Sequence, residues 1–113
     1  MPRFLISILR PTDYDDRVET AQMAAEIDAL NDDMVSANVR RFVCGVQPIQ
    51  LAKHVLLSDG EPEVHPGQRD RTERHVGGFW VLELNSVEEA EEWAVRAARA
   101  CRADVEIRPI YGN

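Results

Sequence analysis

The sequence has 113 residues, of which 44% are hydrophobic and 29% charged, and its formal net charge at pH 7 is −7. This length predicts one domain, residues 1–113, with enough chain to bury a core. An acidic chain is poorly suited to binding nucleic acid, because a nucleic-acid-binding protein must neutralise phosphates with basic side chains. No apolar run is long enough to cross a membrane and the N-terminus lacks a signal-peptide pattern, so we expect a cytoplasmic protein without a membrane partner.

The first half of the chain predicts a strand, a helix and a second strand. Phe4–Arg10 is almost continuously apolar, as is typical of a central strand. Arg17–Ala37 predicts a helix, because apolar residues recur along it at helical spacing. Arg40–Gly45 predicts the next strand, and a unit of this length favours a right-handed crossover to a parallel neighbour. The helical stripe consists of Met23, Ile27, Leu30 and Met34, and Asn38 follows as a residue that tolerates a left-handed helix end.

A β-hairpin is predicted in the middle of the chain. Its arms are Ala52–Leu57 and Pro62–His65, and the Asp59-Gly60 pair between them is a strong signal of a tight hairpin turn. The following stretch, Pro66–Arg74, is the most polar part of the sequence and predicts an exposed loop.

The best-patterned stretch begins at Gly77-Gly78. The two glycines favour a bend, a bulge or the close approach of another backbone, and Phe79–Leu84 predicts a second central strand. Ser86 and Glu89 have the spacing of a capping box, and small apolar residues then recur at helical spacing. Asp104–Ile110 alternates between polar and apolar residues, as expected of an edge strand.

Together these elements predict a ferredoxin-like α+β sandwich with an inserted β-hairpin. Both helices are expected to cover one face of the sheet. We expect the other face to carry Phe and Trp side chains. A homodimer that packs sheet against sheet, as a dimeric α+β barrel, would cover that face.

The polar loop supplies the candidate acid/base residues. His65 and His75 flank the loop, and either could pair with Asp70 if the loop covers a pocket. Histidine suits proton transfer near neutral pH, and a carboxylate fixes its tautomer. The alternative is a solvated loop without chemistry. His54 alternates within a hairpin arm, which favours a surface position.

The same loop carries three arginines, Arg69, Arg71 and Arg74, that could bind a carboxylate or a phosphate. The interleaved Asp70 and Glu73 favour local neutralisation instead. Aspartates near residue 15 lack the further ligands and the glycine of a calcium loop, and no phosphate-binding glycine motif is present. We therefore expect neither a metal nor a cofactor.

The chain resembles the YCII-related family, in particular its DGPF-domain branch, over nearly its whole length. The resemblance rests on Asn31–Met34, Ser58-Asp59-Gly60, Gly77–Trp80, Asn85–Ala94 and Val105–Ile110. It implies a dimeric assembly of ferredoxin-like subunits. Some members look like enzymes that eliminate a leaving group from aromatic-type substrates with a His/Asp pair, and others occur beside, or joined to, extracytoplasmic-function sigma factors.

Two features of that branch are missing from this chain. Where an Asp-Gly-Pro-Phe motif is expected, the sequence has His65–Arg69 with only Gly67 retained, and the helix around Ile27 contains no histidine. No catalytic dyad is therefore transferred. We expect a homodimeric module that binds a small molecule, with cofactor-free elimination or isomerisation as its chemistry. The alternatives are a non-catalytic regulatory or interaction module associated with transcription, and a purely structural dimer.

Overall fold

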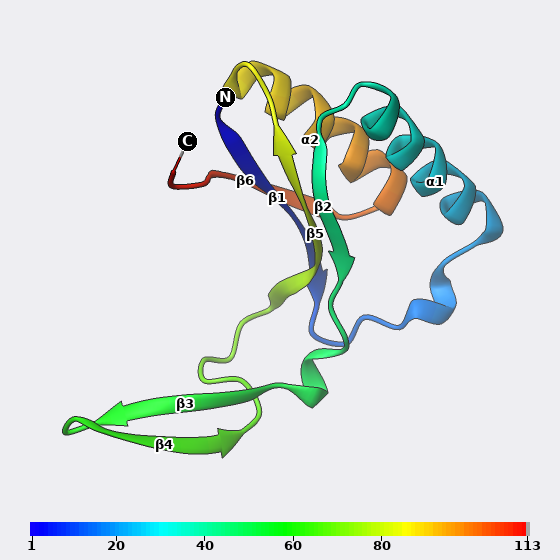
Figure 1. Cartoon of the computed structure of the whole chain (residues 1–113). Coiled ribbons are helices and arrows are strands. Elements are labelled where there is room, and N and C mark those ends of the chain that lie inside the picture. Colours follow the sequence, from blue (N-terminus) through cyan, green and yellow to red (C-terminus); the bar gives the residue numbers. More distant parts are fainter. Residues whose placement is uncertain (113) are drawn as a thin grey trace.

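The computed structural model describes residues 1–112 and shows an α+β fold with two helices and two antiparallel sheets (Figure 1). Short 3-10 helices precede α1 and follow β2. None of the described helices is long and apolar enough to cross a membrane. In chain order the elements are β1 (Arg3–Pro11), a 3-10 helix (Asp16–Val18), α1 (Ala21–Ser36), β2 (Arg40–Gly45), a 3-10 helix (Ile49–Leu51), β3 (Lys53–Ser58), β4 (Glu61–Pro66), β5 (Arg74–Glu83), α2 (Val87–Cys101) and β6 (Asp104–Pro109).

The larger sheet has the strand order β2-β5-β1-β6, and every neighbouring pair is antiparallel. The central positions of β1 and β5 and the edge position of β6 were predicted correctly. The prediction that β2 is a parallel neighbour of β1 was wrong, because β5 lies between them. The crossover through α1 skips one strand position, and β5 later fills it. This order is compatible with two split strand–helix–strand units.

Helix α1 begins at Ala21, later than the predicted Arg17. The Thr20 side chain accepts a hydrogen bond of 3.1 Å from the backbone N–H of Met23 and so caps the helix. The residues before it form the separate 3-10 helix, which Asp15 caps through the N–H of Arg17. The predicted apolar stripe of α1 is confirmed: Met23, Leu30 and Met34 are buried, and Ile27 packs against the core.

Helix α2 begins with the capping box expected from the sequence. The Ser86 side chain accepts a hydrogen bond from the N–H of Glu89, and the Glu89 carboxylate accepts one from the N–H of Asn85. Small side chains on its inner face, Ala90, Ala94, Ala97, Ala100 and Cys101, are all buried. These small residues let the helix lie close to the sheet.

The two faces of the sheet differ in what covers them. Trp80 is buried on the face that the helices cover, together with Ile6 and Leu82. Phe79 points to the opposite face, where its ring centroid lies 5.9 Å from that of Phe42. The expectation that Trp also lies on the uncovered face was therefore wrong. Strand alternation places the two residues on opposite faces, and the larger side chain fills the core.

The β3–β4 hairpin forms as predicted and projects away from the four-stranded sheet and both helices (Figure 1). Asp59 and Gly60 have φ angles of 48° and 82°, as a two-residue hairpin turn of the primed type requires. The radius of gyration is 16.0 Å, whereas a compact chain of this length has about 13 Å. The projecting hairpin accounts for the larger radius of gyration.

One charged group on the uncovered face joins three strands and gives the fold a dependence on pH. Glu83 on β5 accepts hydrogen bonds of 3.1 Å from Arg3 on β1 and from Arg41 on β2. These two hydrogen bonds hold the pKa of the Glu83 carboxyl below its ordinary value of 4.5. Above the ordinary pKa of 4.5 the ionised Glu83 therefore stabilises the folded state in full. This stabilisation is lost as the pH falls through the lowered pKa of the folded state.

We therefore expect Glu83→Gln to lower the melting temperature at pH 7 and to change it much less at pH 3. Thermal unfolding of both proteins at the two pH values measures this. Glu91→Gln serves as the control, because Glu91 is exposed on α2 beyond its first turn and forms no ion pair among the described residues. An equal effect of Glu83→Gln at both pH values would contradict the assignment.

Candidate functional site

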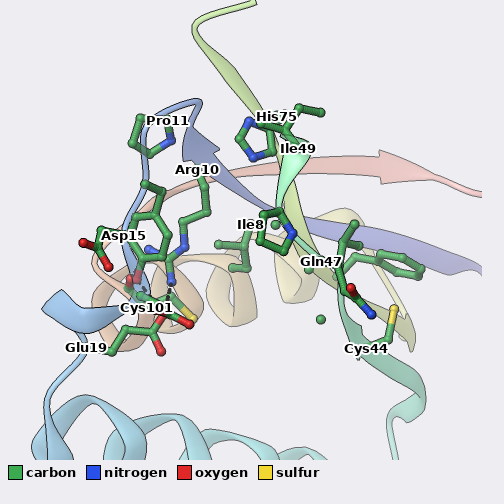
Figure 2. Close-up of a pocket in the computed structure, with 18 of the residues that line it drawn as sticks. Ile8, Arg10, Pro11, Asp15, Glu19, Cys44, Gln47, Ile49, His75 and Cys101 are labelled. Carbon is green, nitrogen blue, oxygen red and sulfur yellow. Dashed lines mark hydrogen bonds and ion pairs between the residues drawn. The ribbon is translucent and has the colours of Figure 1, made fainter. Parts of the chain in front are cut away.

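A cavity of about 770 Å³ lies where the ends of β1, β2 and β5 meet the chain between β1 and α1 (Figure 2). Helix α1 contributes Ile27 and Asn31 to its wall, and α2 contributes Cys101. Figure 2 places Arg10, Glu19 and Cys101 on one side of the cavity and Gln47 on the other. Residues from five elements and two connecting segments therefore converge on one space, although they are far apart in the sequence.

A shift in the register of β1 and β5 places His75 on the same face of the sheet as Arg10. The two residues lie directly opposite each other, so their side chains leave the same face of the sheet. The register shifts between Ile8, which pairs with Gly78, and Leu9, which pairs with Val76. Gly77 is the extra residue of this β-bulge, and bulges commonly redirect side chains near functional sites.

Gly77 and Gly78 each lie so close to another residue that a Cβ atom would not fit. A Cβ atom on Gly77 would lie 2.6 Å from Cγ of Arg10, and one on Gly78 would lie 3.0 Å from the carbonyl oxygen of Cys44. The sequence-based expectation of a bulge or a close backbone approach is thus confirmed in both forms. Gly77 opens the path along which the Arg10 side chain enters the cavity.

Arg10 is held in place from three directions. Its Nη1 donates a hydrogen bond of 2.8 Å to the carbonyl oxygen of Cys101, and its Nη2 lies 4.0 Å from Oε2 of Glu19. Its guanidinium carbon lies 4.2 Å from the centroid of the Tyr14 ring, a cation–π distance. Only 12% of the Arg10 side chain is exposed, so the positive charge is fixed at the cavity wall.

Tyr14 and Glu19 complete this polar end of the cavity. The Tyr14 hydroxyl donates a hydrogen bond of 2.6 Å to Oε2 of Glu19. Burial and this hydrogen bond raise the pKa of Tyr14 to about 12, so the phenol stays protonated at physiological pH. The same carboxylate therefore accepts from Tyr14 and lies near Arg10, which ties the segment before α1 to the end of β1.

His75 is the cavity residue with unused hydrogen-bonding capacity. Its Nδ1 atom is buried and has no hydrogen-bond partner among the described residues. A buried polar atom without a partner is unusual, because leaving it unpaired costs about 1–3 kcal/mol. Because Nδ1 is closed to solvent in this orientation of the ring, a ligand in the cavity would bond it only after the imidazole rotates, and the direction of that hydrogen bond depends on the tautomer.

The rest of the wall is mainly apolar. Ile8, Val43 and Trp80 contribute to it, and the Trp80 indole is fixed by a hydrogen bond of 2.8 Å from Nε1 to Oδ1 of Asn31. Burial raises the pKa of the Cys101 thiol, which therefore stays protonated and acts as a small apolar group. An apolar wall with a few fixed polar groups is the usual make-up of a small-molecule site.

The predicted acid/base residues are placed in different parts of the molecule. His75 lines the cavity. His65 lies on the hairpin, where its ring stacks on that of His54 with centroids 5.3 Å apart. Asp70 is exposed in the loop and forms an ion pair of 2.7 Å with Arg69. Neither His65 nor Asp70 belongs to the wall of the large cavity among residues 1–112.

The predicted anion-binding arginines are also separated. Arg69 is occupied by Asp70. Arg71 and Arg74 line a second, more open cavity of about 650 Å³ at the base of the hairpin, and Arg74 also forms an ion pair of 3.2 Å with Asp104. The polar loop therefore borders this second cavity and does not cover the first.

Sequence reasoning missed Arg10, Tyr14 and Glu19 as site residues. Arg10 ends an apolar strand and Tyr14 lies in a turn, and neither position has a motif that marks it. The available signal was indirect: Gly77-Gly78 predicted a close approach, but its partner could not be named before β1 was paired with β5.

No protein-family model matches the chain, and no curated protein is recognisably similar to it in sequence. The resemblance to the YCII-related family and the function that it implies therefore stay predictions, and the geometry of the cavity has to carry the functional argument.

Gly77→Ala should destabilise the protein by about 1–3 kcal/mol, the usual cost of overpacking, because the new methyl group would displace the largely enclosed side chain of Arg10. Gly45→Ala is the matched control, since a Cβ there meets nothing within 4 Å. Urea unfolding measures both free energies. We expect Gly45→Ala to be neutral or slightly stabilising, and an equal loss in the two variants would contradict the role given to Gly77.

Proposed function

We propose that this protein is a homodimeric module that binds a small organic molecule in the cavity around Arg10 and His75. The observation that carries the proposal is the cavity itself. Its volume of about 770 Å³ lies within the range of about 300–1,000 Å³ found for small-molecule sites. A fixed positive charge and an unpaired imidazole nitrogen at the same apolar cavity supply the convergent polar groups that such sites use.

The lining supports a ligand with an apolar body and one polar end. The apolar body would pack against Trp80 and Val43, and the polar end would face His75. If the module is an enzyme, His75 is the residue that we expect to move a proton, because Tyr14 and Cys101 keep theirs. Elimination and isomerisation both need such a proton transfer and no cofactor.

The assembly that we propose is a ferredoxin-like sandwich that pairs through its uncovered sheet face into a dimeric α+β barrel. The strand order β2-β5-β1-β6 and the placement of both helices on one face support it. The uncovered face carries Phe79 and Phe42, and Phe42 is 53% exposed. Burying such side chains against a second copy is favourable, because about 25 cal/mol is gained for each Å² of apolar surface removed from water.

The binding proposal is tested by thermal shift with three probe classes: aromatic carboxylates, lactones and organic phosphates. We expect one class to raise the melting temperature in a concentration-dependent way, since a ligand at about 100 times its Kd adds about 2.7 kcal/mol to stability. His75→Gln should weaken that binding, because it replaces the imidazole that faces the cavity.

Arg69→Gln is the control, because Arg69 lies in the exposed loop and outside the cavity wall. If Arg69→Gln weakens binding and His75→Gln does not, the loop is the site and the cavity proposal is wrong. A failure of all three classes with the wild-type protein would count against small-molecule binding itself.

A second candidate function is a non-catalytic regulatory or interaction module. The observation that favours it is the Arg69–Asp70 ion pair, which leaves Asp70 in the exposed loop and away from His75. Asp15 and Asp16 also line the cavity, but no hydrogen bond or ion pair joins either of them to His75 among the described residues. Binding of a probe without its conversion would favour this function over an enzyme, and conversion that Arg69→Gln leaves unchanged and His75→Gln abolishes would favour the enzyme.

A further inference from the structure

The β3–β4 hairpin has one apolar face that nothing in residues 1–112 covers. Val55 on β3 lies opposite Val64 on β4, and Leu57 lies opposite Pro62. The exposed fractions of Val55, Leu57 and Val64 are 59%, 76% and 70%. Paired residues share a face, so these four side chains form one continuous apolar surface, which we call the bare face.

The opposite face of the hairpin is already in use. The rings of His54 and His65 stack on each other there, and Nδ1 of His54 lies 2.8 Å from the carbonyl oxygen of Gly67. The N–H of Gly67 in turn donates to the carbonyl oxygen of Ala52. The chain that leaves the hairpin therefore returns along its histidine side. The apolar side chains that are most exposed on the hairpin therefore lie on the bare face.

A hairpin of this kind needs a partner to be well ordered. A two-stranded sheet by itself is marginally stable in water, and a third strand or a packed layer is usually required. Here β3 and β4 pair only with each other among the described strands. The exposed branched and leucine side chains of the bare face are of the kind that marks a protein–protein contact.

The hairpin is attached beside the other uncovered surface of the molecule. It leaves the body from the end of β2 at Gly45 and returns at the start of β5 at Arg74. These are the two strands that carry Phe42 and Phe79 on the uncovered sheet face. A copy of the chain that packs on that face is therefore close to the root of the hairpin.

The areas favour a partner that uses both surfaces. With strands about 4.8 Å apart and roughly 3.3 Å per residue, the sheet face projects about 400 Å² and the hairpin face about 200 Å². A stable interface buries about 800 Å² on each partner. Side chains give each face more accessible surface than its flat projection, so the projections are compared only with each other: the hairpin face adds about half as much area again to a contact with one partner.

We propose that the hairpin is an arm whose bare face packs on a second copy of this chain. The proposal rests on the homodimer proposed above and adds the arm as a second contact. In a two-fold dimer each copy gives one arm and receives one, so the contact is made twice. An arm of this kind would lower the Kd of the dimer, although it does not belong to the hydrophobic core of either copy.

The test compares two neighbouring residues that point to opposite faces of the hairpin. Leu57→Asp places a charge on the bare face, and Ser58→Asp places the same side chain on the other face. Both positions are exposed, so neither change should unfold the monomer. Sedimentation over a dilution series gives the Kd of the dimer for each full-length protein.

We expect Leu57→Asp to raise the dimer Kd about tenfold or more, because a charge buried in an interface is costly, and Ser58→Asp to change it less than about threefold. A wild-type dimer whose Kd is the same in both variants would overturn the arm and leave the sheet-face dimer standing. A wild-type protein that stays monomeric at all concentrations would overturn the arm and the proposed dimer together.

Hydrogen exchange on the wild-type protein gives a readout that needs no variant. We expect the backbone amides of residues 53–66 to become more protected as the concentration rises through the dimer transition. Protection that stays at the monomer level in the dimer would overturn the arm. Neither outcome depends on whether the cavity binds a small molecule.

Discussion

The pairing of β1 with β5 is the interaction on which the rest of the structure depends. These strands are the two central ones, and the core side chains Ile6 and Trp80 face each other across them. One extra residue, Gly77, shifts the register near the end of the pair. Because of that shift, His75 instead of Val76 lies opposite Arg10, on the face of the sheet that lines the cavity. A single bulge thus links the stability of the sheet to the chemistry of the site.

The cavity has a mainly apolar wall and one polar end, where the side chains are held in place by their neighbours. Arg10 is held by the carbonyl of Cys101, by Tyr14 and by Glu19, so its charge is already partly neutralised. A strongly anionic ligand would therefore gain less from Arg10 than from a free guanidinium. His75, whose Nδ1 has no partner among the described residues, keeps more capacity to discriminate between ligands. This division of roles favours a ligand recognised mainly by shape and by one hydrogen bond.

Two apolar surfaces are left without cover by the described residues, and they are connected through the same strands. The uncovered sheet face carries Phe42 and Phe79, and the hairpin that grows from β2 and β5 carries the bare face. A chain of this size buries only about two-thirds of the surface of its unfolded state. The proposed assembly with a second copy would bury part of the remaining surface and would leave the cavity on the helix side of the sheet.

The elements could be predicted well because their signals are local. The Asp59-Gly60 turn, the capping by Ser86 and Glu89 and the left-handed Asn38 depend on a few neighbouring residues. Errors occurred where two local signals competed. Several residues before α1 have helical propensity, but Thr20 provides the stronger cap, so the helix begins after it.

The sequence by itself determined the number and order of the elements, the central position of two strands and the need for glycine at residues 77 and 78. It pointed to the polar loop as the site, because that loop collects His, Asp and Arg side chains. Only the tertiary structure decided that Arg10 meets His75 and that Asp70 stays in the loop. The physical reason is that strand register is set by pairing between segments about 65 residues apart, and no local pattern specifies where a bulge shifts it.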